Sequence, residues 1–176
     1  TWFRVMWYVT SQKNGVSALG LQRVLGLGSY KTAWAMLHKL RRAMVRPGRD
    51  RLSGTVEVDE TYWGADEQPV IGRLTYDKAL IGVAAQQDGR GIGRIRLRRL
   101  VELTKASVHG FIAQAIEPGS TVVTDGLRLY QGLEGYTHRP IVVKHQPEDA
   151  STLLPRVHRV TSLLKRWLLG THQGAV

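Results

Sequence analysis

Two aspartates occupy strand-like segments, where an unpaired charge is unfavourable. Asp59 lies inside Thr55–Tyr62, whose β-branched residues alternate as in a strand, and Asp125 follows the apolar run Thr121–Thr124. A buried carboxylate costs roughly a few kcal/mol unless it is paired or bound to a metal. If the two strands are neighbours, both acids meet at strand carboxyl ends, where open α/β sheets place their sites. Two anionic oxygens held together favour a cation between them, and Mg²⁺ is the natural candidate.

Both acids also have plain structural explanations. Asp125 with Gly126 could start a turn or cap a following helix. The acids Glu57, Asp59 and Glu60 could be edge-strand charges that pair with arginines. Because both aspartates occupy sheet positions in a chain that also has a basic module, we favour the metal interpretation.

The elements that would hold these acids form an α/β fold, a mixed sheet with helices on its faces. The predicted strands are Thr55–Tyr62, Lys78–Gln86, Ile92–Leu100, Ser120–Thr124 and Pro140–Val143. The predicted helices after residue 100 are Thr104–Ile116, Leu127–Leu133 and Pro155–Leu169. We expect the strand of Asp59 to lie beside the strand that ends at Asp125.

A small helical module precedes the sheet and holds most of the positive charge. Residues 46–50 have linker composition, which divides the chain into a module of residues 1–50 and a domain of residues 51–176. Residues 1–54 contain ten Lys and Arg and one Asp, hence +9 of the net charge of +11. Such concentration favours nucleic acid as the partner, with a solubilising surface as the plain alternative.

Two helices of this module have the proportions of a helix-turn-helix. The second is predicted to run from Tyr30 to Met44, after a break at Gly26–Ser29. The residues expected at DNA phosphates or base edges are Lys31, Lys39, Arg41 and Arg42. The tryptophans predicted to be core residues of the module are Trp2, Trp7 and Trp34.

Composition excludes several classes of protein. The chain is 43% apolar and 22% charged, which is ordinary for a globular protein and excludes wholesale disorder. No stretch approaches the roughly 20 apolar residues that span a bilayer, so we expect no membrane partner. The chain has no cysteine, which excludes disulfides and thiolate metal sites within it.

Three segments together resemble a bacterial insertion-sequence transposase of the DDE type, in the group with a zinc ribbon, a helix-turn-helix and a ribonuclease-H-like catalytic domain. The segments are Val56–Tyr62, Thr124–Gly126 with Tyr130, and His158–His172. The resemblance covers nearly the whole chain and implies a ribonuclease-H-like fold and metal-dependent cleavage and transfer of DNA strands. It also implies double-stranded DNA as partner, both transposon ends and target. It allows a homo-oligomer on that DNA and implies a bacterial cytoplasmic, nucleoid-associated location.

The resemblance assigns roles to particular residues. It makes Asp59 and Asp125 the first two catalytic acids. Together they would bind two metal ions, either Mg²⁺ or Mn²⁺. Lys165 matches a catalytic basic residue of the family's last helix, and His158 stands where the third acid is expected. His158 could ligate a metal, orient a phosphate or take no part. The residues of that helix expected to hold phosphates are Arg156, Arg159, Lys165 and Arg166, although a solvated face is the plainer explanation of its arginines alone.

The chain departs from the family's pattern in three respects. It lacks the third acid and the cysteines of a zinc ribbon, and both of its ends look truncated. Three functions therefore remain open. The first is a transposase or a fragment of one, the second is a catalytically impaired DNA-binding derivative of the same fold, and the third is a nuclease that hydrolyses without joining.

Overall fold

The computed structural model describes residues 1–45, 48–64, 78–141 and 153–172, which form two compact units. The first unit is Thr1–Arg49 together with residues 163–172 of the described chain, and the second is Asp50–Ser162. Within the described ranges, no helix is long and apolar enough to cross a membrane. The functional division into residues 1–50 and 51–176 stays a prediction.

The first unit contains three helices, α1 (Trp2–Ser11), α2 (Ala18–Leu25) and α3 (Tyr30–Met44). The hydroxyl oxygen of Ser17 accepts a hydrogen bond from the N–H of Gly20 and caps α2. Gly26 ends α2 in the left-handed conformation, with φ +62°. The buried core residues of this unit are Val5, Val16, Leu21, Ala33, Met36 and Leu37.

The predicted burial of the tryptophans in this unit is wrong. Trp7 is 71% exposed and Trp34 is 49% exposed, and Trp2 is also exposed. A ten-residue helix buries only the face that meets its neighbours, and in α1 Val5 alone is fully buried. The Trp34 ring instead lies against the ring of His38 on the next turn of α3, with 3.8 Å between centroids.

The last part of helix α6 (Pro155–His172) belongs to the first unit and depends on glycine. A Cβ atom at Gly170 would overlap the carbonyl oxygen of Asn14. Gly15 has φ +74°, and a Cβ atom there would overlap the hydroxyl of Thr171. Close contact between the helix and the loop before α2 therefore explains the glycine in the Leu169–Gly170–Thr171 sequence.

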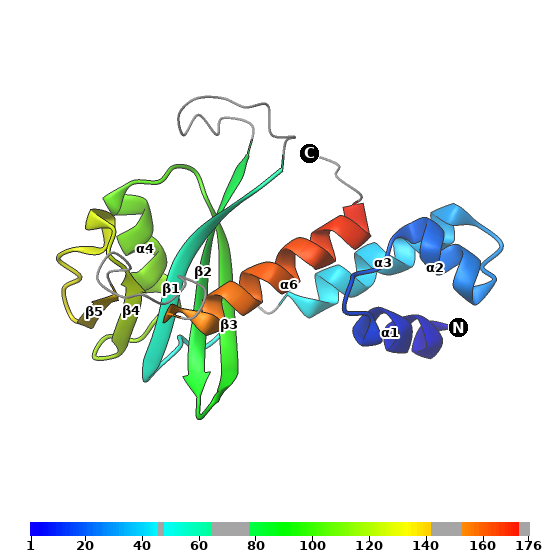
Figure 1. Cartoon of the computed structure of the whole chain (residues 1–176). Helices are drawn as coiled ribbons and strands as arrows, with labels where there is room; N and C mark the ends of the chain where they lie inside the picture. The colour runs from blue at the N-terminus through cyan, green and yellow to red at the C-terminus, as the bar shows by residue number, and fades with distance from the viewer. Residues whose placement is uncertain (46–47, 65–77, 142–152, 173–176) are drawn as a thin grey trace. The chain divides into compact units, whose positions relative to one another are not determined.

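The second unit is a five-stranded mixed sheet, which confirms the predicted fold class (Figure 1). Its strands are β1 (Thr55–Trp63), β2 (Ala79–Asp88), β3 (Gly91–Leu100), β4 (Thr121–Asp125) and β5 (Thr137–Ile141). Their order is β3-β2-β1-β4-β5, with β2 antiparallel to both β1 and β3, and with β4 parallel to both β1 and β5. Because β1 is the central strand, its acids are not edge-strand charges, although Glu57 does pair with an arginine, Arg156.

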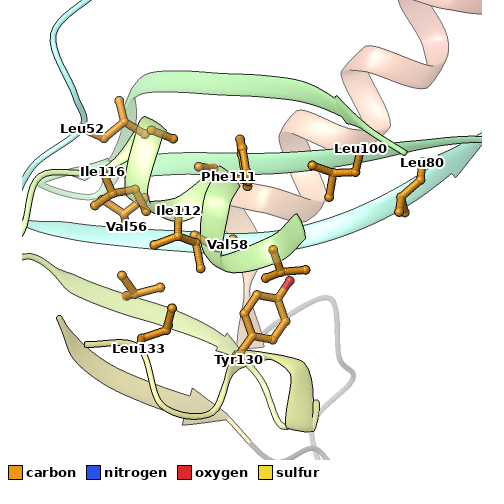
Figure 2. Packing of buried hydrophobic residues seen from close by; sticks show 14 residues of the cluster. Leu52, Val56, Val58, Leu80, Leu100, Phe111, Ile112, Ile116, Tyr130 and Leu133 are labelled. Carbon is orange, nitrogen blue, oxygen red and sulfur yellow. The ribbon is translucent and has the colours of Figure 1, made fainter. Parts of the chain in front are cut away.

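Helices cover both faces of this sheet. On one face, α4 (Lys105–Ala115) packs Phe111 and Ile112 against Val56 and Val58 of β1 (Figure 2). On the other face, the first turns of α6 pack their valines against β2; the residues of this smaller core are Val83, Ala85, Val157 and Val160. The resulting helix–sheet–helix layering holds β1 and β4 in the middle of the unit.

Two predicted elements differ in the structure. The predicted helix Leu127–Leu133 is only a single 3₁₀ turn, η1 (Arg128–Tyr130). A side-chain oxygen of Asp125 accepts a hydrogen bond from the N–H of Leu127 at 3.1 Å, so turn chemistry replaces a helix start there. β5 spans residues 137–141, whereas the predicted strand was 140–143. Residues 142 and 143 of that prediction lie outside the described ranges.

Candidate active site

The register of β1 and β4 brings the two predicted catalytic aspartates to the same level. The parallel pairing places Thr55 beside Thr121 and Glu57 beside Val123, a separation of 66 residues along the chain. Asp59 and Asp125 are also 66 residues apart, two positions beyond the last pair. The two strands are neighbours, as the sequence predicted, and Asp125 is the last residue of β4, whereas Asp59 lies in the middle of β1.

Strand alternation also puts both aspartates on one face of the sheet. The even-numbered residues Val56, Val58 and Val122 belong to the core beneath α4. Side chains at odd positions of the same strands point to the opposite face, which α6 covers. The two carboxylates therefore share a face as well as a level.

Burial and a neighbouring acid both affect the charge of Asp59. Burial raises its pKa to about 6, although its Oδ1 accepts a stabilising hydrogen bond from the N–H of Glu60 at 2.9 Å. The negative charge of Asp125 raises the pKa further. The two carboxylates thus repel each other in a partly desolvated environment, and a bound cation would reduce this repulsion.

A second acid, the partly buried Glu60, borders this pair from the other face of β1. The hydroxyl of Tyr130 donates a 2.6 Å hydrogen bond to Oε2 of Glu60. Burial is the main cause that raises the pKa of Glu60, and the charges of Asp59 and Asp125 add to it. Burial, followed by the charge of Glu60, raises the pKa of Tyr130, so its hydroxyl remains a donor. This bond ties the turn after β4 to β1, and Figure 2 shows Tyr130 among the core side chains.

Glu57 and Arg156 form a buried ion pair that connects β1 to α6. Oε1 of Glu57 lies 2.8 Å from Nη1 of Arg156, and the Glu57 side chain is 5% exposed. The other nitrogens of the guanidinium donate to the carbonyl oxygens of Gly91 at 2.9 Å and Gly89 at 3.2 Å. Arg156 was expected to hold phosphates, but protein acceptors engage its guanidinium on three sides. A DNA contact by Arg156 stays an untested prediction.

Sequence reasoning missed the partners of Glu57 and Glu60. Glu57 and Arg156 are 99 residues apart, and Glu60 and Tyr130 are 70 apart, so no local spacing connects them. The available signal was the alternation of β1, which points Glu60 into the apolar core and Glu57 towards the face of Asp59. An acid in a buried strand needs a partner, but only the fold supplies its identity.

The other predicted site residues lie on α6 and α3. On α6, His158 is partly exposed and follows the anchored first turn, whereas Arg159, Lys165 and Arg166 are exposed. Lys165 and Arg166 belong to the part of α6 in the first unit. Among the residues that the structure describes, no three His, Asp or Glu side chains are placed to hold one metal ion. Of the predicted site residues within the described ranges, the structure therefore brings together Asp59 and Asp125.

The basic side chains of α3 are mostly exposed. Lys31, Lys39 and Arg42 are accessible, whereas Arg41 is partly buried and lies 5.8 Å from the ring centroid of Trp167. A hollow of about 380 Å³ lies beside this helix, lined by Trp2, Lys31, Thr32, Ala35, Met36 and Lys39. The face therefore offers two ammonium groups beside an indole ring and contains no acid.

Residues 51–176 match the ISXO2-like transposase domain family. A curated relative, described as an uncharacterised protein in transposable element ISH50 of Halobacterium salinarum, is 30% identical over 167 residues. The match covers 83% of this chain and 54% of the relative, so the chain spans about half the length of that relative. A chain in the structure of the simian T-cell lymphotropic virus intasome with PP2A regulatory subunit B56 gamma has 16% identity and a TM-score of 0.43. That likeness covers 81% of this chain and 53% of the other.

Proposed function

This chain belongs to the ISXO2-like transposase domain family, and on that premise we propose that it cleaves and transfers DNA strands with divalent metal ions. The observation that carries this proposal is the pair Asp59 and Asp125, level with each other on two neighbouring parallel strands. Its DNA partners would be the ends of an insertion sequence and a target, bound by an oligomer of this chain.

The donor set fits Mg²⁺ or Mn²⁺. Both ions prefer carboxylate oxygens, and Asp59 and Asp125 offer such oxygens on one face of the sheet. Burial and mutual repulsion raise the pKa of Asp59, and both effects oppose two negative charges without a cation. When bound, the metal would activate a water or a 3′-hydroxyl and stabilise the leaving oxygen.

The protein's own residues would position the DNA and the acids. Glu60 and Tyr130 hold the turn after β4 against β1, which keeps Asp125 beside Asp59. His158, on the first turns of α6, is our candidate for the third position of the site. The exposed residues Arg159, Lys165 and Arg166 would contact phosphates, which adds affinity without sequence preference.

We expect His158→Glu to raise Mn²⁺-dependent nicking of supercoiled plasmid DNA by about tenfold, because a carboxylate is a better ligand for a hard cation. Gel quantification of nicked plasmid measures the rate. Ser162→Glu, which adds the same side chain one turn further along α6 at an exposed position, is the control and should change little. A rate below that of the wild type would show that the imidazole itself works in the site.

DNA binding by the first unit should depend steeply on salt. For each phosphate contacted, the logarithm of affinity falls by about 0.9 per decade of salt on duplex DNA. We expect Lys31→Gln and Lys39→Gln each to reduce this slope by about that amount, because both side chains are exposed on α3. Fluorescence anisotropy with a labelled duplex measures it, and Lys13→Gln in the loop before α2 is the control. Equal slopes in all four proteins would contradict an interface at α3.

A second candidate function follows from the sequence, because His158 stands where the third acid is expected. That function is a derivative that binds DNA without cutting it. Such a protein would show the salt-dependent affinity but no nicking with Mn²⁺. Wild-type nicking that stops at hydrolysis, with no joined product, would instead indicate a nuclease.

A further inference from the structure

Glu57 lies close in sequence to Asp59, one of the two metal-ligand candidates, and its carboxylate already has hydrogen-bond partners in the protein. Alternation places it on the same face of β1 as Asp59, two residues earlier, and it is 4% exposed. From sequence alone, pairing with an arginine is one explanation of this acid. In the structure both of its oxygens accept hydrogen bonds from α6.

The first turn of α6 depends on Glu57 for its hydrogen bonds. Pro155 has no N–H, and the N–H of His158 donates to the carbonyl oxygen of Leu154 at 3.1 Å. The two N–H groups between them, of Arg156 and Val157, donate to Oε2 of Glu57 at 2.8 and 3.0 Å. The first turn contains no acid of its own, so Glu57 supplies the negative charge that a helix start favours.

Arg156 fastens the same turn to a second part of the sheet. Its guanidinium pairs with Glu57 and donates to the carbonyl oxygens of Gly89 and Gly91, at the hairpin between β2 and β3. Val157 packs beside it, fully buried against β2. The start of α6 is thus held by backbone caps, a buried ion pair and apolar contact, all within the second unit.

We propose that Glu57 and Arg156 are a positioning pair, which sets the first turn of α6, with His158, on the face of the sheet that carries Asp59 and Asp125. The inference rests on the proposed function. The path is short, because Glu57 is two residues from Asp59 and its carboxylate binds the N–H of Val157, the neighbour of His158. Glu57 touches no reacting atom in this role and acts only through the elements that it joins.

The test uses the whole chain with Glu57→Gln, Arg156→Met and the double variant. The glutamine of Glu57→Gln keeps one oxygen for the helix N–H groups but turns an amide donor towards Arg156. In the double variant that conflict is gone and the cap remains. We measure kcat and KM for Mn²⁺-dependent plasmid nicking per folded molecule, and amide hydrogen exchange at residues 156–158.

We expect Glu57→Gln to lower kcat by roughly 10- to 100-fold with KM unchanged, because a displacement of about 1 Å has effects of that size. Exchange at residues 156–158 should rise in parallel. The double variant should recover both to within a few-fold of the wild type. Ile116→Ala, in the core on the α4 side, is the control that lowers stability without changing kcat per folded molecule.

Two results would overturn the proposal. An unchanged kcat per folded molecule in Glu57→Gln would make the pair merely structural. A double variant that regains its exchange protection but stays inactive would make Glu57 a metal ligand or an electrostatic participant. If the wild type itself shows no nicking, the proposed function fails, and hydrogen exchange alone decides whether Glu57 holds the turn. Unchanged amide hydrogen exchange at residues 156–158 in Glu57→Gln would then show that Glu57 does not hold the first turn of α6.

Discussion

Replacing Asp59 or Asp125 by asparagine should abolish metal-dependent nicking and joining of DNA, a loss of about a thousandfold or more. A divalent ion contributes several kcal/mol of transition-state stabilisation, and each 1.4 kcal/mol is about tenfold in rate. In the wild type, a side-chain oxygen of Asp125 accepts a hydrogen bond from the N–H of Leu127, and one of Asp59 accepts a hydrogen bond from the N–H of Glu60. Asparagine keeps a side-chain oxygen that can accept the same bond at either position. The variants therefore remove charge and leave the local turns intact.

The same two variants should lose stabilisation by Mn²⁺. A ligand that binds only the folded protein adds about 2.7 kcal/mol at one hundred times its dissociation constant. Thermal melts with and without Mn²⁺ measure this gain, which both variants should lack. Without metal they should be at least as stable as the wild type, because burial and repulsion already disfavour the charge of Asp59.

Two further measurements make this test specific. DNA affinity should stay equal or rise in both variants, because each loses a negative charge near the expected phosphates. Asp88→Asn, which changes an exposed acid at the end of β2, is the control and should leave both activity and the Mn²⁺ effect unchanged. If Mn²⁺ shifts neither the stability nor the nicking of the wild type, the acids are structural and the metal proposal is wrong.

Breaking the Glu57–Arg156 pair should have the largest effect on stability. Removing one partner of a buried, hydrogen-bonded ion pair costs about 3–5 kcal/mol, because the other charge stays buried without compensation. Glu57→Leu should therefore lower the melting temperature of the second unit by about 10–20 °C. Circular dichroism melts and urea titrations measure this change.

The double variant Glu57→Leu/Arg156→Met should regain most of that loss, because it leaves no unpaired buried charge. A deficit of about 1–2 kcal/mol should remain, since the N–H groups of Arg156 and Val157 lose their acceptor in Glu57. Strictly additive losses from the two single changes would contradict a coupled pair. Arg159→Met, an exposed arginine three residues further along α6, is the matched control.

The sequence by itself predicted the fold class and the neighbouring strands of the two aspartates, which the structure confirms, whereas the catalytic role of these aspartates stays a prediction. Alternating β-branched residues and turn signals identified the strands of Asp59 and Asp125, because side-chain direction in a strand follows a period of two. The unequal distribution of charge likewise identified a basic helical module, since composition does not depend on tertiary contacts. Family membership followed from short motifs that span the chain, and residues 51–176 match that family.

Only the tertiary structure decided which protein groups the acids of β1 bind. It paired Glu57 with Arg156 and Glu60 with Tyr130, across 99 and 70 residues of chain. It also exposed Trp7 and Trp34, which apolar patterning had placed in the core. Periodicity tells which face of an element a side chain occupies, but the partner on that face depends on how distant elements pack. For this reason the sequence could not show that Asp59 and Asp125 lie at the same height in the sheet. That follows from the register of β1 and β4, which no local sequence pattern encodes.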